Sequence, residues 1–438
     1  MLDIKFIREN EKELKKAIKN KNLSLDLDAL ISLDKERVEH IQKIEELKAL
    51  KNNLNNRVSA AKDDEERKKA IEEGKTIKER LSELEPELNA INEKFEEMMV
   101  QVPTIPSADT PIGKSEEDNV EIARWGEPEF KGGFKPKDHI EIGKALDIID
   151  FERGAKVAGF RGYYLKGDGA AIVLALMMYA AEKMIKKGYP LTIPPTLVKE
   201  FALFGSGYFK GREYDPETDE IYLVGSGDRE ATGEKSRDKK FLVGTAEPSL
   251  LAYYSDEVID EEKLPIKASG FSQCYRSEIG SYGKDVKGLY RVHEFMKVEQ
   301  VVICRDDKKE AEMLQEEMIA ISKEMHEELG LPYRQVIICT GELGPGKYRQ
   351  YDLEVWLPGM NRWAETGSAS IFLDWQSRRL NVKYADKSGK KKFVYMLNNT
   401  ALPSPRPLIA ILENYQTEDG KVRVPEVLKK YLGKDIIG

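Results

Sequence analysis

The chain has 438 residues and a formal net charge of −8 at pH 7, so it is long enough for two or three domains and acidic overall. Nucleic-acid-binding domains are usually basic, so any such binding here must use a local cationic patch. The N-terminus has no apolar signal core, and the longest apolar run (170–181) is too short to span a bilayer.

Cysteine and histidine usage indicates the redox setting. Cys274, Cys304 and Cys339 lie far apart without a CxxC pair, and the four histidines are scattered. This pattern supports neither a disulfide framework nor a zinc site. We therefore expect a cytoplasmic protein without zinc, in which carboxylates would hold any metal ion.

Residues 1–102 are expected to be helical, because they contain almost no proline or glycine. Apolar residues of the second half recur at alternating steps of four and three, which is a heptad seam: Ile77, Leu81, Leu84, Leu88, Ile91, Phe95, Met98 and Val102. The polar stretch SAAKDDEE (59–66) suits a reversal, so two helices of about 32 residues should pair antiparallel over about 48 Å. Pro86 should kink the second helix locally.

Two roles for this arm are open. The heptad spacing alone favours a dimerisation coiled coil. The stretch from 47 to 62 instead carries Lys48, Lys51, Arg57 and Lys62 without any acid, which is the local patch that phosphate binding requires. A solvated helix face would explain the same four residues.

The remainder of the chain is predicted to be an α+β domain. PTIPSADTPIGKSEEDN (103–119) is a proline-rich linker. Beyond it, an amphipathic helix at 308–330 lies among alternating runs such as RQVIIC, YDLEVWL and FVYML. These runs predict a largely antiparallel sheet flanked by helices.

CYRSEIGSYGKDVKGLYRVHEFMKVEQ (274–300) is expected to form a hairpin with a long loop. In a strand alternate residues share a face, so one face carries charge and an aromatic ring: Arg276, Glu278, Arg291, His293, Phe295, Lys297 and Glu299. Guanidinium groups bind phosphate or carboxylate, an aromatic ring stacks on a base, and carboxylates receive an ammonium. The face therefore suits a nucleotide and an amine, although Arg–Glu ion pairs on a surface hairpin are the alternative.

Three weaker motifs add oxygen ligands and a cation. FLVGTAEPSL (241–250) places Thr245 and Glu247 on one side of an extended segment. Glu365 and Ser368 could hold Mg²⁺ beside a triphosphate. Arg406 stands at the start of an apolar helix, where the helix dipole disfavours a cation, so it is expected to serve an anion.

GELGPGKY (341–348) almost matches a phosphate-binding loop, but we reject that interpretation. Tyr348 stands in place of the hydroxyl residue that would hold Mg²⁺, and a strand rather than a helix follows.

Taken in order, these segments resemble class II aminoacyl-tRNA synthetases, and closely the seryl-tRNA synthetase family. The resemblance covers nearly the whole chain and is carried by GYPLTIPP, GTAEPSL, YRSEIGSYGKDVKGLYRVHEFMKVE, YDLEVWLPG, AETGSASIF and PRPLIAILENYQ. It implies a helical tRNA-binding arm at 1–102, a linker at 103–120 and a class II catalytic domain at 121–438 with an antiparallel sheet. About 16 extra residues between FGSG and GTAE depart from the family and should form a loop or hairpin near the rim of the active site.

The same resemblance implies roles for single residues. Serine would be bound by Thr245, Ala246, Glu247, Glu299 and Thr400. ATP would be bound by Arg276, Ser277, Glu278, Arg291, Val292, His293, Glu294, Phe295, Glu365, Thr366, Gly367, Ser368 and Arg406. Arg276 and Arg406 would be catalytic, Glu365 and Ser368 would hold Mg²⁺, and Lys48, Lys51, Arg57 and Lys62 would contact tRNA. The loop 280–290 would meet the tRNA acceptor end, and Pro195 would help to form a dimer interface.

The implied activity is serine–tRNA ligation in a homodimer, with tRNA(Ser) bound across the subunits. Charging of tRNA(Sec) is a further option. A synthetase-like ligase that loads a carrier protein is the alternative enzyme, although such relatives generally lack the arm. A non-catalytic coiled-coil adaptor would have no reason to keep the array of arginines and glutamates.

Overall fold

The computed structural model describes residues 1–61, 63–225, 229, 232–234, 236, 238–279 and 287–438. Its contacts divide the chain into two units. A helical unit consists of Leu2–Lys19 and Leu23–Val102. The other unit, called the catalytic unit below because it contains the catalytic domain expected at 121–438, consists of Met1, Asn20–Asn22 and Pro103–Gly438.

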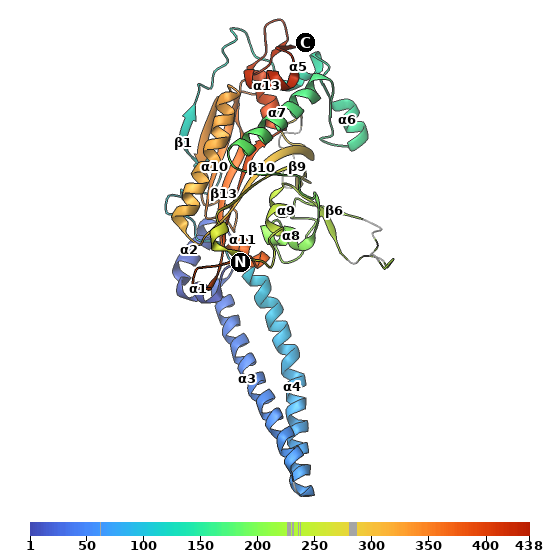
Figure 1. Ribbon diagram of the computed structural model, residues 1–438, viewed down its shortest axis with the longest axis vertical. Coiled ribbons are helices and arrows are strands. Elements are labelled where there is room, and N and C mark those ends of the chain that lie inside the picture. The colour runs from blue at the N-terminus through green and yellow to red at the C-terminus, as the bar shows by residue number, and fades with distance from the viewer. Residues whose placement is uncertain (62, 226–228, 230–231, 235, 237, 280–286) are drawn as a thin grey trace. The chain divides into compact units, whose positions relative to one another are not determined.

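The helical unit is dominated by two long antiparallel helices that lie side by side, as the heptad spacing predicts (Figure 1). They follow two short helices, and the four elements are α1 (Ile4–Glu9), α2 (Glu11–Asn20), α3 (Leu27–Ala60) and α4 (Asp64–Met99). Asp26 and Asp63 cap the two long helices, because each carboxylate accepts a bond from a backbone N–H of the first turn. The helical assignment of α4 continues through Pro86.

Apolar burial holds these two helices together. Ile44 of α3 is buried against Leu81 and Leu84 of α4. Nearer the start of α3, the buried carboxylate of Asp34 accepts hydrogen bonds from Arg8 of α1 and Arg37 of α3. This buried carboxylate therefore finds its partners within the unit itself.

The catalytic unit is built on an eight-stranded sheet. The strand order is β1 (Val120–Trp125), β11 (Tyr333–Ile337), β12 (Arg349–Leu357), β13 (Arg362–Leu373), β16 (Tyr395–Pro403), β10 (Glu294–Cys304), β9 (Ile266–Tyr275) and β4 (Leu191–Thr192). Neighbouring strands are antiparallel except for β4, which runs parallel to β9. The predicted antiparallel α+β architecture is therefore confirmed.

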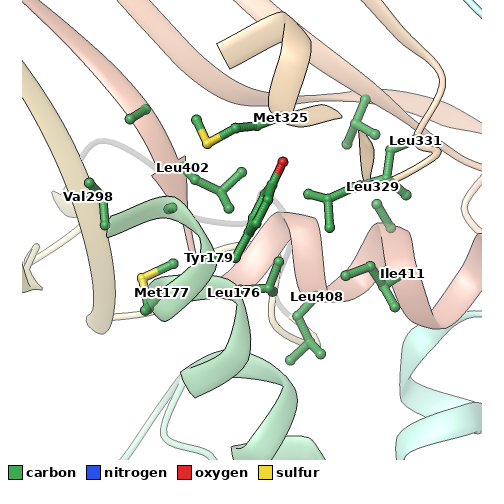
Figure 2. Close-up of a cluster of buried hydrophobic side chains, with 14 of the residues drawn as sticks. Leu176, Met177, Tyr179, Val298, Met325, Leu329, Leu331, Leu402, Leu408 and Ile411 are labelled. Carbon is green, nitrogen blue, oxygen red and sulfur yellow. The ribbon is translucent and has the colours of Figure 1, made fainter. Parts of the chain in front are cut away.

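Helices cover one face of this sheet and enclose the main core. The principal ones are α7 (Asp168–Lys186), α10 (Lys308–Glu328), α12 (Pro405–Asn414) and α13 (Glu426–Leu432). Figure 2 shows Tyr179 of α7 between Met325 of α10 and Leu408 of α12, with Val298 of β10 nearby. Burial of these side chains fixes β10, β16 and α12, which carry much of the site described below.

The shorter elements of the catalytic unit complete its edges. They are η1 (Glu116–Asp118), α5 (His139–Ala145), β2 (Ile149–Asp150), α6 (Phe151–Ala158), β3 (Tyr164–Leu165), β5 (Leu197–Lys199), α8 (Glu200–Ser206), β6 (Tyr222–Val224), β7 (Lys240–Leu242), α9 (Glu247–Ala252), β8 (Val258–Asp260), η2 (Glu261–Lys263), α11 (Trp375–Leu380), β14 (Lys383–Ala385), β15 (Lys391–Phe393), β17 (Val422–Arg423) and β18 (Ile436–Ile437). The extra segment predicted near the rim joins β6 to β7, and these strands pair antiparallel as a hairpin. No helix among the described residues is both long enough and apolar enough to cross a membrane.

Candidate active site

A cavity of about 570 Å³, open to solvent, lies over the sheet in the catalytic unit. Its lining comes from the β9–β10 connection, strands β10, β13 and β16, and the start of α12. The lining residues are Arg276, Glu278, Tyr290, Arg291, Val292, Phe295, Lys297, Glu365, Thr366, Gly367, Thr400, Pro403, Pro405 and Arg406. Two arginines of the β9–β10 connection and one from the start of α12 therefore line one space.

The hairpin predicted at 274–300 is present, but its strands are shorter than expected. β9 and β10 pair with Cys274 opposite Phe295, and they end at Tyr275 and Glu294. Arg276, Glu278, Arg291 and His293 consequently lie in the connection rather than on a strand face. Glu278 adopts a left-handed backbone (φ 54°), which breaks the alternation that was expected there. Residues 280–286, in the loop predicted to meet tRNA, lie outside the described residues.

On β10 the expected alternation holds. Val298 and Val302 face the helix-covered core, whereas Phe295, Lys297 and Thr400 of the neighbouring β16 line the cavity. The ring of Phe295 lies 5.5 Å from the Arg276 guanidinium. This arrangement offers an aromatic face and a cation side by side, which suits a purine base followed by its phosphates.

Each arginine of the cavity is oriented by a neighbour. The Nε of Arg276 donates to the Gly244 carbonyl at 3.4 Å. Nη1 of Arg291 donates to the Glu278 carboxylate at 3.1 Å. These contacts aim two cations into a space that an anion can enter.

Arg406 reaches the cavity from the first turn of α12, just after Pro405. Its Nη1 donates to the Glu365 carbonyl at 2.6 Å and lies 3.5 Å from the Glu365 carboxylate. Its guanidinium also stacks 4.5 Å from the ring centre of Tyr290. The unfavourable interaction of the Arg406 cation with the helix dipole is thus offset by a carboxylate and an aromatic ring.

The predicted serine-binding residues are buried, but not in the geometry expected. Glu247 is the first residue of α9 and Ala246 has helical dihedrals, so Thr245 and Glu247 do not share one side of an extended segment. Glu247 accepts a bond from Nε2 of Gln376 at 2.6 Å. Burial, and then the charge of Glu299, raise the pKa of Glu247 to about 7. Among the described residues, the buried Oγ1 of Thr245 finds no hydrogen-bond partner.

The buried Lys297 and Glu299 and the half-buried Thr400 form a polar group at the wall of the cavity. Nζ of Lys297 lies 2.6 Å from the Glu299 carboxylate and 3.2 Å from the Thr400 hydroxyl, which itself donates to Glu299 at 3.2 Å. A bulge in the β10–β16 pairing places Glu299 directly opposite Thr400. Sequence reasoning gave no role to Lys297, although the strand alternation placed it on this face.

A second bulge turns Glu365 and Ser368 to the same face of β13. They are three residues apart, so a regular strand would turn them to opposite faces. Leu353 pairs with Gly367 and the next residue pairs with Glu365, so Thr366 is the extra residue. The hydroxyl of Thr366 bonds Nε2 of His326 on α10 at 2.8 Å, so only its backbone is free to line the cavity.

Asp352 of β12 was missed at the sequence level. It stands directly opposite Ser368 in the β12–β13 pairing. Burial, and then the charge of Glu365, raise the pKa of Asp352 to about 7. The described residues contain no group of three or more His, Cys, Asp or Glu side chains that could hold a metal ion. The oxygen ligands of Glu365 and Ser368 nevertheless fit Mg²⁺, which takes few protein ligands when phosphates supply others.

The other predicted nucleotide residues contribute unequally. Val292 lines the cavity, and an added Cβ on Gly367 would lie 3.1 Å from the Thr400 carbonyl, so only glycine fits there without a shift. Ser277, His293, Glu294 and Ser368 are not among the lining residues. The Glu294 carboxylate instead accepts a bond from Gln273 at 2.8 Å on the exposed side of the hairpin.

The basic residues of the arm are partly neutralised. Lys48 lies 2.9 Å from Glu85, and Arg57 lies 3.7 Å from Glu73, both across the α3–α4 pair. Lys51 is on the same helix, whereas Lys62 lies outside the described residues. Acids that are absent from the sequence around these cations are therefore supplied by the facing helix.

An antiparallel sheet of this kind with arginines over one open face defines a class II aminoacyl-tRNA synthetase, and residues 231–415 match the tRNA synthetase class II core domain (G, H, P, S and T). Residues 1–106 match the seryl-tRNA synthetase N-terminal domain. The sequence is 42% identical to a serine–tRNA ligase of Borrelia garinii over 439 residues, covering 99% of this chain and 98% of that protein. The chain belongs to the seryl-tRNA synthetase family and is a ligase.

Solved structures agree with this assignment. The seryl-tRNA synthetase of Pyrococcus horikoshii, complexed with ATP, is similar with a TM-score of 0.88 and 35% identity, covering 100% of this chain and 99% of that one. The cytoplasmic serine–tRNA ligase of Naegleria fowleri, in complex with AMP, has a TM-score of 0.84 and 31% identity over 100% and 98% of the two chains. These comparisons give no support to a carrier-protein ligase or to charging of tRNA(Sec).

Proposed function

We propose that the cavity activates L-serine with ATP and that the enzyme then transfers serine to the 3′ end of tRNA(Ser). The observation that carries this proposal is the convergence of Arg276, Arg291 and Arg406 on one cavity that also holds the Phe295 ring. A triphosphate carries several negative charges, and guanidinium groups bind such oxygens bidentately. ATP is therefore the first substrate that this space suits.

In the first step a serine carboxylate oxygen attacks the α-phosphorus of ATP. The new oxygen–phosphorus bond forms as the bond to the pyrophosphate oxygen breaks, and the products are seryl-adenylate and pyrophosphate. Arg276 would bridge the serine carboxylate and the α-phosphate, while Arg291 and Arg406 would hold the γ-phosphate. Catalysis would rest on positioning and charge stabilisation, since no side chain has to act as a nucleophile.

Serine selection would depend on the buried polar groups. Glu247 would accept the substrate ammonium, whose positive charge favours the ionised carboxylate. Glu299 and Thr400 would bond the serine hydroxyl. A site that binds a hydroxyl in this way rejects alanine strongly, because alanine leaves buried polar groups unpaired.

Glu365 and Ser368 would hold Mg²⁺ together with phosphate oxygens. When bound, the ion would neutralise phosphate charge as pyrophosphate departs. The chain's own part is to supply oxygen ligands on one face of β13, which the bulge at Thr366 makes possible. Arg406 would share this task from the opposite side of Glu365.

In the second step the terminal ribose hydroxyl of tRNA attacks the serine carbonyl carbon, and AMP leaves. We propose that residues 1–102 are the tRNA-binding arm, with Lys48, Lys51, Arg57 and Lys62 near phosphates, and that residues 121–438 are the catalytic domain. We also propose a cytoplasmic homodimer with tRNA bound across its subunits. Exposed apolar residues on α7, Leu174 and Met178, support such an interface.

The test is serine-dependent exchange between ATP and pyrophosphate. Arg276→Ala should lower exchange by on the order of 10³-fold, because it removes the cation that bridges both reacting groups. Arg305→Ala is the matched control, since Arg305 pairs with Glu310 outside the cavity. Near-normal exchange in a folded Arg276→Ala variant would contradict the assignment.

A further inference from the structure

Just before it reaches the cavity, the β9–β10 connection contacts a buried histidine. His139, the first residue of α5, is 1% exposed, and Nε2 of its imidazole accepts a hydrogen bond from the backbone N–H of Leu289 at 3.0 Å. The preceding Gly288 has a φ of 78°, and a Cβ added to it would lie 2.2 Å from Nε2 of His139. Glycine therefore allows the backbone to approach the imidazole this closely.

The other side of His139 is held by the buried Glu413 of α12. Oε1 of Glu413 accepts a bond from the backbone N–H of His139 at 3.1 Å and lies 3.2 Å from Nδ1 of the imidazole. Oε2 accepts bonds from the backbone N–H groups of Gly359 at 2.8 Å and Met360 at 3.3 Å. Backbone N–H groups can only donate, so both oxygens of this carboxylate act as acceptors.

These contacts determine where the imidazole carries its proton. The Leu289 N–H can only donate, so Nε2 of His139 has no proton. The neutral ring then keeps its proton on Nδ1, which donates to Oε1 of Glu413. His139 is thus a neutral bridge that donates to α12 and accepts from the β9–β10 connection.

The two residues after Leu289 lead to both arginines proposed for the γ-phosphate. The Tyr290 carbonyl accepts a bond from Nε of Arg406 at 3.3 Å, and the Tyr290 ring lies 4.5 Å from the Arg406 guanidinium. Arg291 follows directly in the chain and also lines the cavity. The bond at Leu289 therefore supports Arg291 through the backbone and Arg406 through Tyr290.

We propose that His139 is a positioning residue for ATP, which anchors Leu289 so that Arg291 and Arg406 are held ready for the γ-phosphate. This inference rests on the proposed role of those two arginines. A cation that is already held in place loses less conformational freedom when a phosphate binds, so the complex is tighter. Without the anchor, the buried Leu289 N–H loses its partner and its segment shifts to regain one. AMP has no γ-phosphate, so its affinity should not depend on the anchor.

The experiment measures the affinities of the full-length enzyme for ATP and for AMP by isothermal titration calorimetry, with excess Mg²⁺ throughout. Serine and tRNA are omitted, so ATP is not consumed. His139→Asn keeps a donor for Glu413 but offers Leu289 no acceptor, because its amide nitrogen takes the place of Nδ1. His139→Gln brings an amide oxygen near the position of Nε2, and His139→Met has a similar length without that acceptor. His40→Met, on α3 of the helical unit, is the control.

His139→Asn and His139→Met should each weaken ATP binding by about tenfold and leave AMP binding within roughly twofold of the wild type. His139→Gln should restore most of the ATP affinity, because it again offers Leu289 an acceptor. The comparison of His139→Gln with His139→Met decides the question alone if His139→Asn does not fold. Arg406→Ala should also weaken ATP binding selectively, and it tests the proposed function itself.

Three results would overturn the inference, and they are distinguishable. If Arg406→Ala loses ATP affinity while His139→Met binds ATP as well as His139→Gln does, the γ-phosphate role stands and the anchor is wrong. If Arg406→Ala binds ATP normally, the role of Arg406 fails and this inference fails with it. If all three His139 variants lose AMP as well as ATP, His139 supports the fold as a whole and does not position the arginines.

Discussion

The helical unit and the catalytic unit treat charge in opposite ways. In the helical unit, cations such as Lys48 and Arg57 lie beside carboxylates of the facing helix, exposed to solvent. In the catalytic unit, but outside the lining of the cavity, Glu247 and Asp352 are held where burial and a neighbouring carboxylate raise their pKa values to about 7. The cations of the helical unit already have carboxylate partners. The buried carboxyl groups of the catalytic unit gain cationic partners only when charged ligands bind.

The largest effect is expected when most of the helical unit is removed and the catalytic unit is kept. Replacing residues 30–95 with a short flexible linker should lower aminoacylation of tRNA(Ser) by on the order of 10³-fold or more, because the proposed grip on tRNA phosphates is lost. Serine-dependent ATP–pyrophosphate exchange should stay near the wild-type rate, since the cavity residues all lie in the catalytic unit. Charging that survives the deletion would remove the arm from any role in holding tRNA.

The next test sharpens the account of the polar group at the wall of the cavity. Thr400→Val should reduce the preference for serine over alanine in exchange by about 10²-fold, because one hydrogen bond to the serine hydroxyl is lost. Most of the change should come from slower use of serine. Thr340→Val is the matched control, since that buried hydroxyl bonds the backbone near Gly113. An unchanged preference would place the serine hydroxyl elsewhere.

A third test uses pH and the ligand-free enzyme. The pKa of Glu247 rises from its ordinary value of 4.5 to about 7 on folding, so the folded state holds this proton more tightly than the unfolded state. Stability contributed by this group is therefore lost as the pH rises from about 4.5 to about 7. Glu247→Gln should remove that loss, which amounts to as much as about 3 kcal/mol.

Thermal unfolding at pH 5 and at pH 8 checks this expectation. Relative to the wild type, Glu247→Gln should raise the unfolding temperature more at pH 8 than at pH 5, and serine should no longer stabilise the variant. Glu426→Gln, an exposed change on α13, is the control. An equal shift at both pH values would mean that Glu247 is not held in its protonated form by the empty site.

The smallest effect is expected on the surface of the arm. Lys48→Ala breaks an exposed pair with Glu85 and should change stability by less than about 0.5 kcal/mol. The KM for tRNA should nevertheless rise, and the increase should shrink at high salt, because phosphate contacts are salt-dependent. Urea unfolding and aminoacylation kinetics at two salt concentrations measure the two quantities. A large loss of stability would contradict the view that exposed ion pairs of the arm contribute little to the free energy of unfolding.

The sequence predicted what repeats along the chain. Steps of four and three predicted the α3–α4 pair, and alternation along 290–300 predicted the two faces of β10 from Glu294 onward. Departures from periodicity were not predictable, because they depend on the neighbouring strand. The extra residue at Thr366, the left-handed Glu278 and the helix that begins at Glu247 are all of this kind.

Supporting residues of the site were also missed. Gln376 reaches Glu247 from α11, and Asp352 of β12 stands opposite Ser368, so their roles exist only once distant segments are packed. Arg406 was predicted because the helix dipole disfavours a cation at a helix start, and Arg276 because strand alternation placed it on a charged face. Residues with ordinary local surroundings carry no such signal.

The most direct test of the central claim is a crystal structure of the enzyme with ATP bound. The account predicts the adenine over Phe295, the α-phosphate within about 3 Å of the Arg276 guanidinium, and a bent triphosphate whose γ-phosphate meets Arg406. A triphosphate that extends away from Arg406, or one that leaves Arg276 without a phosphate contact, would contradict it.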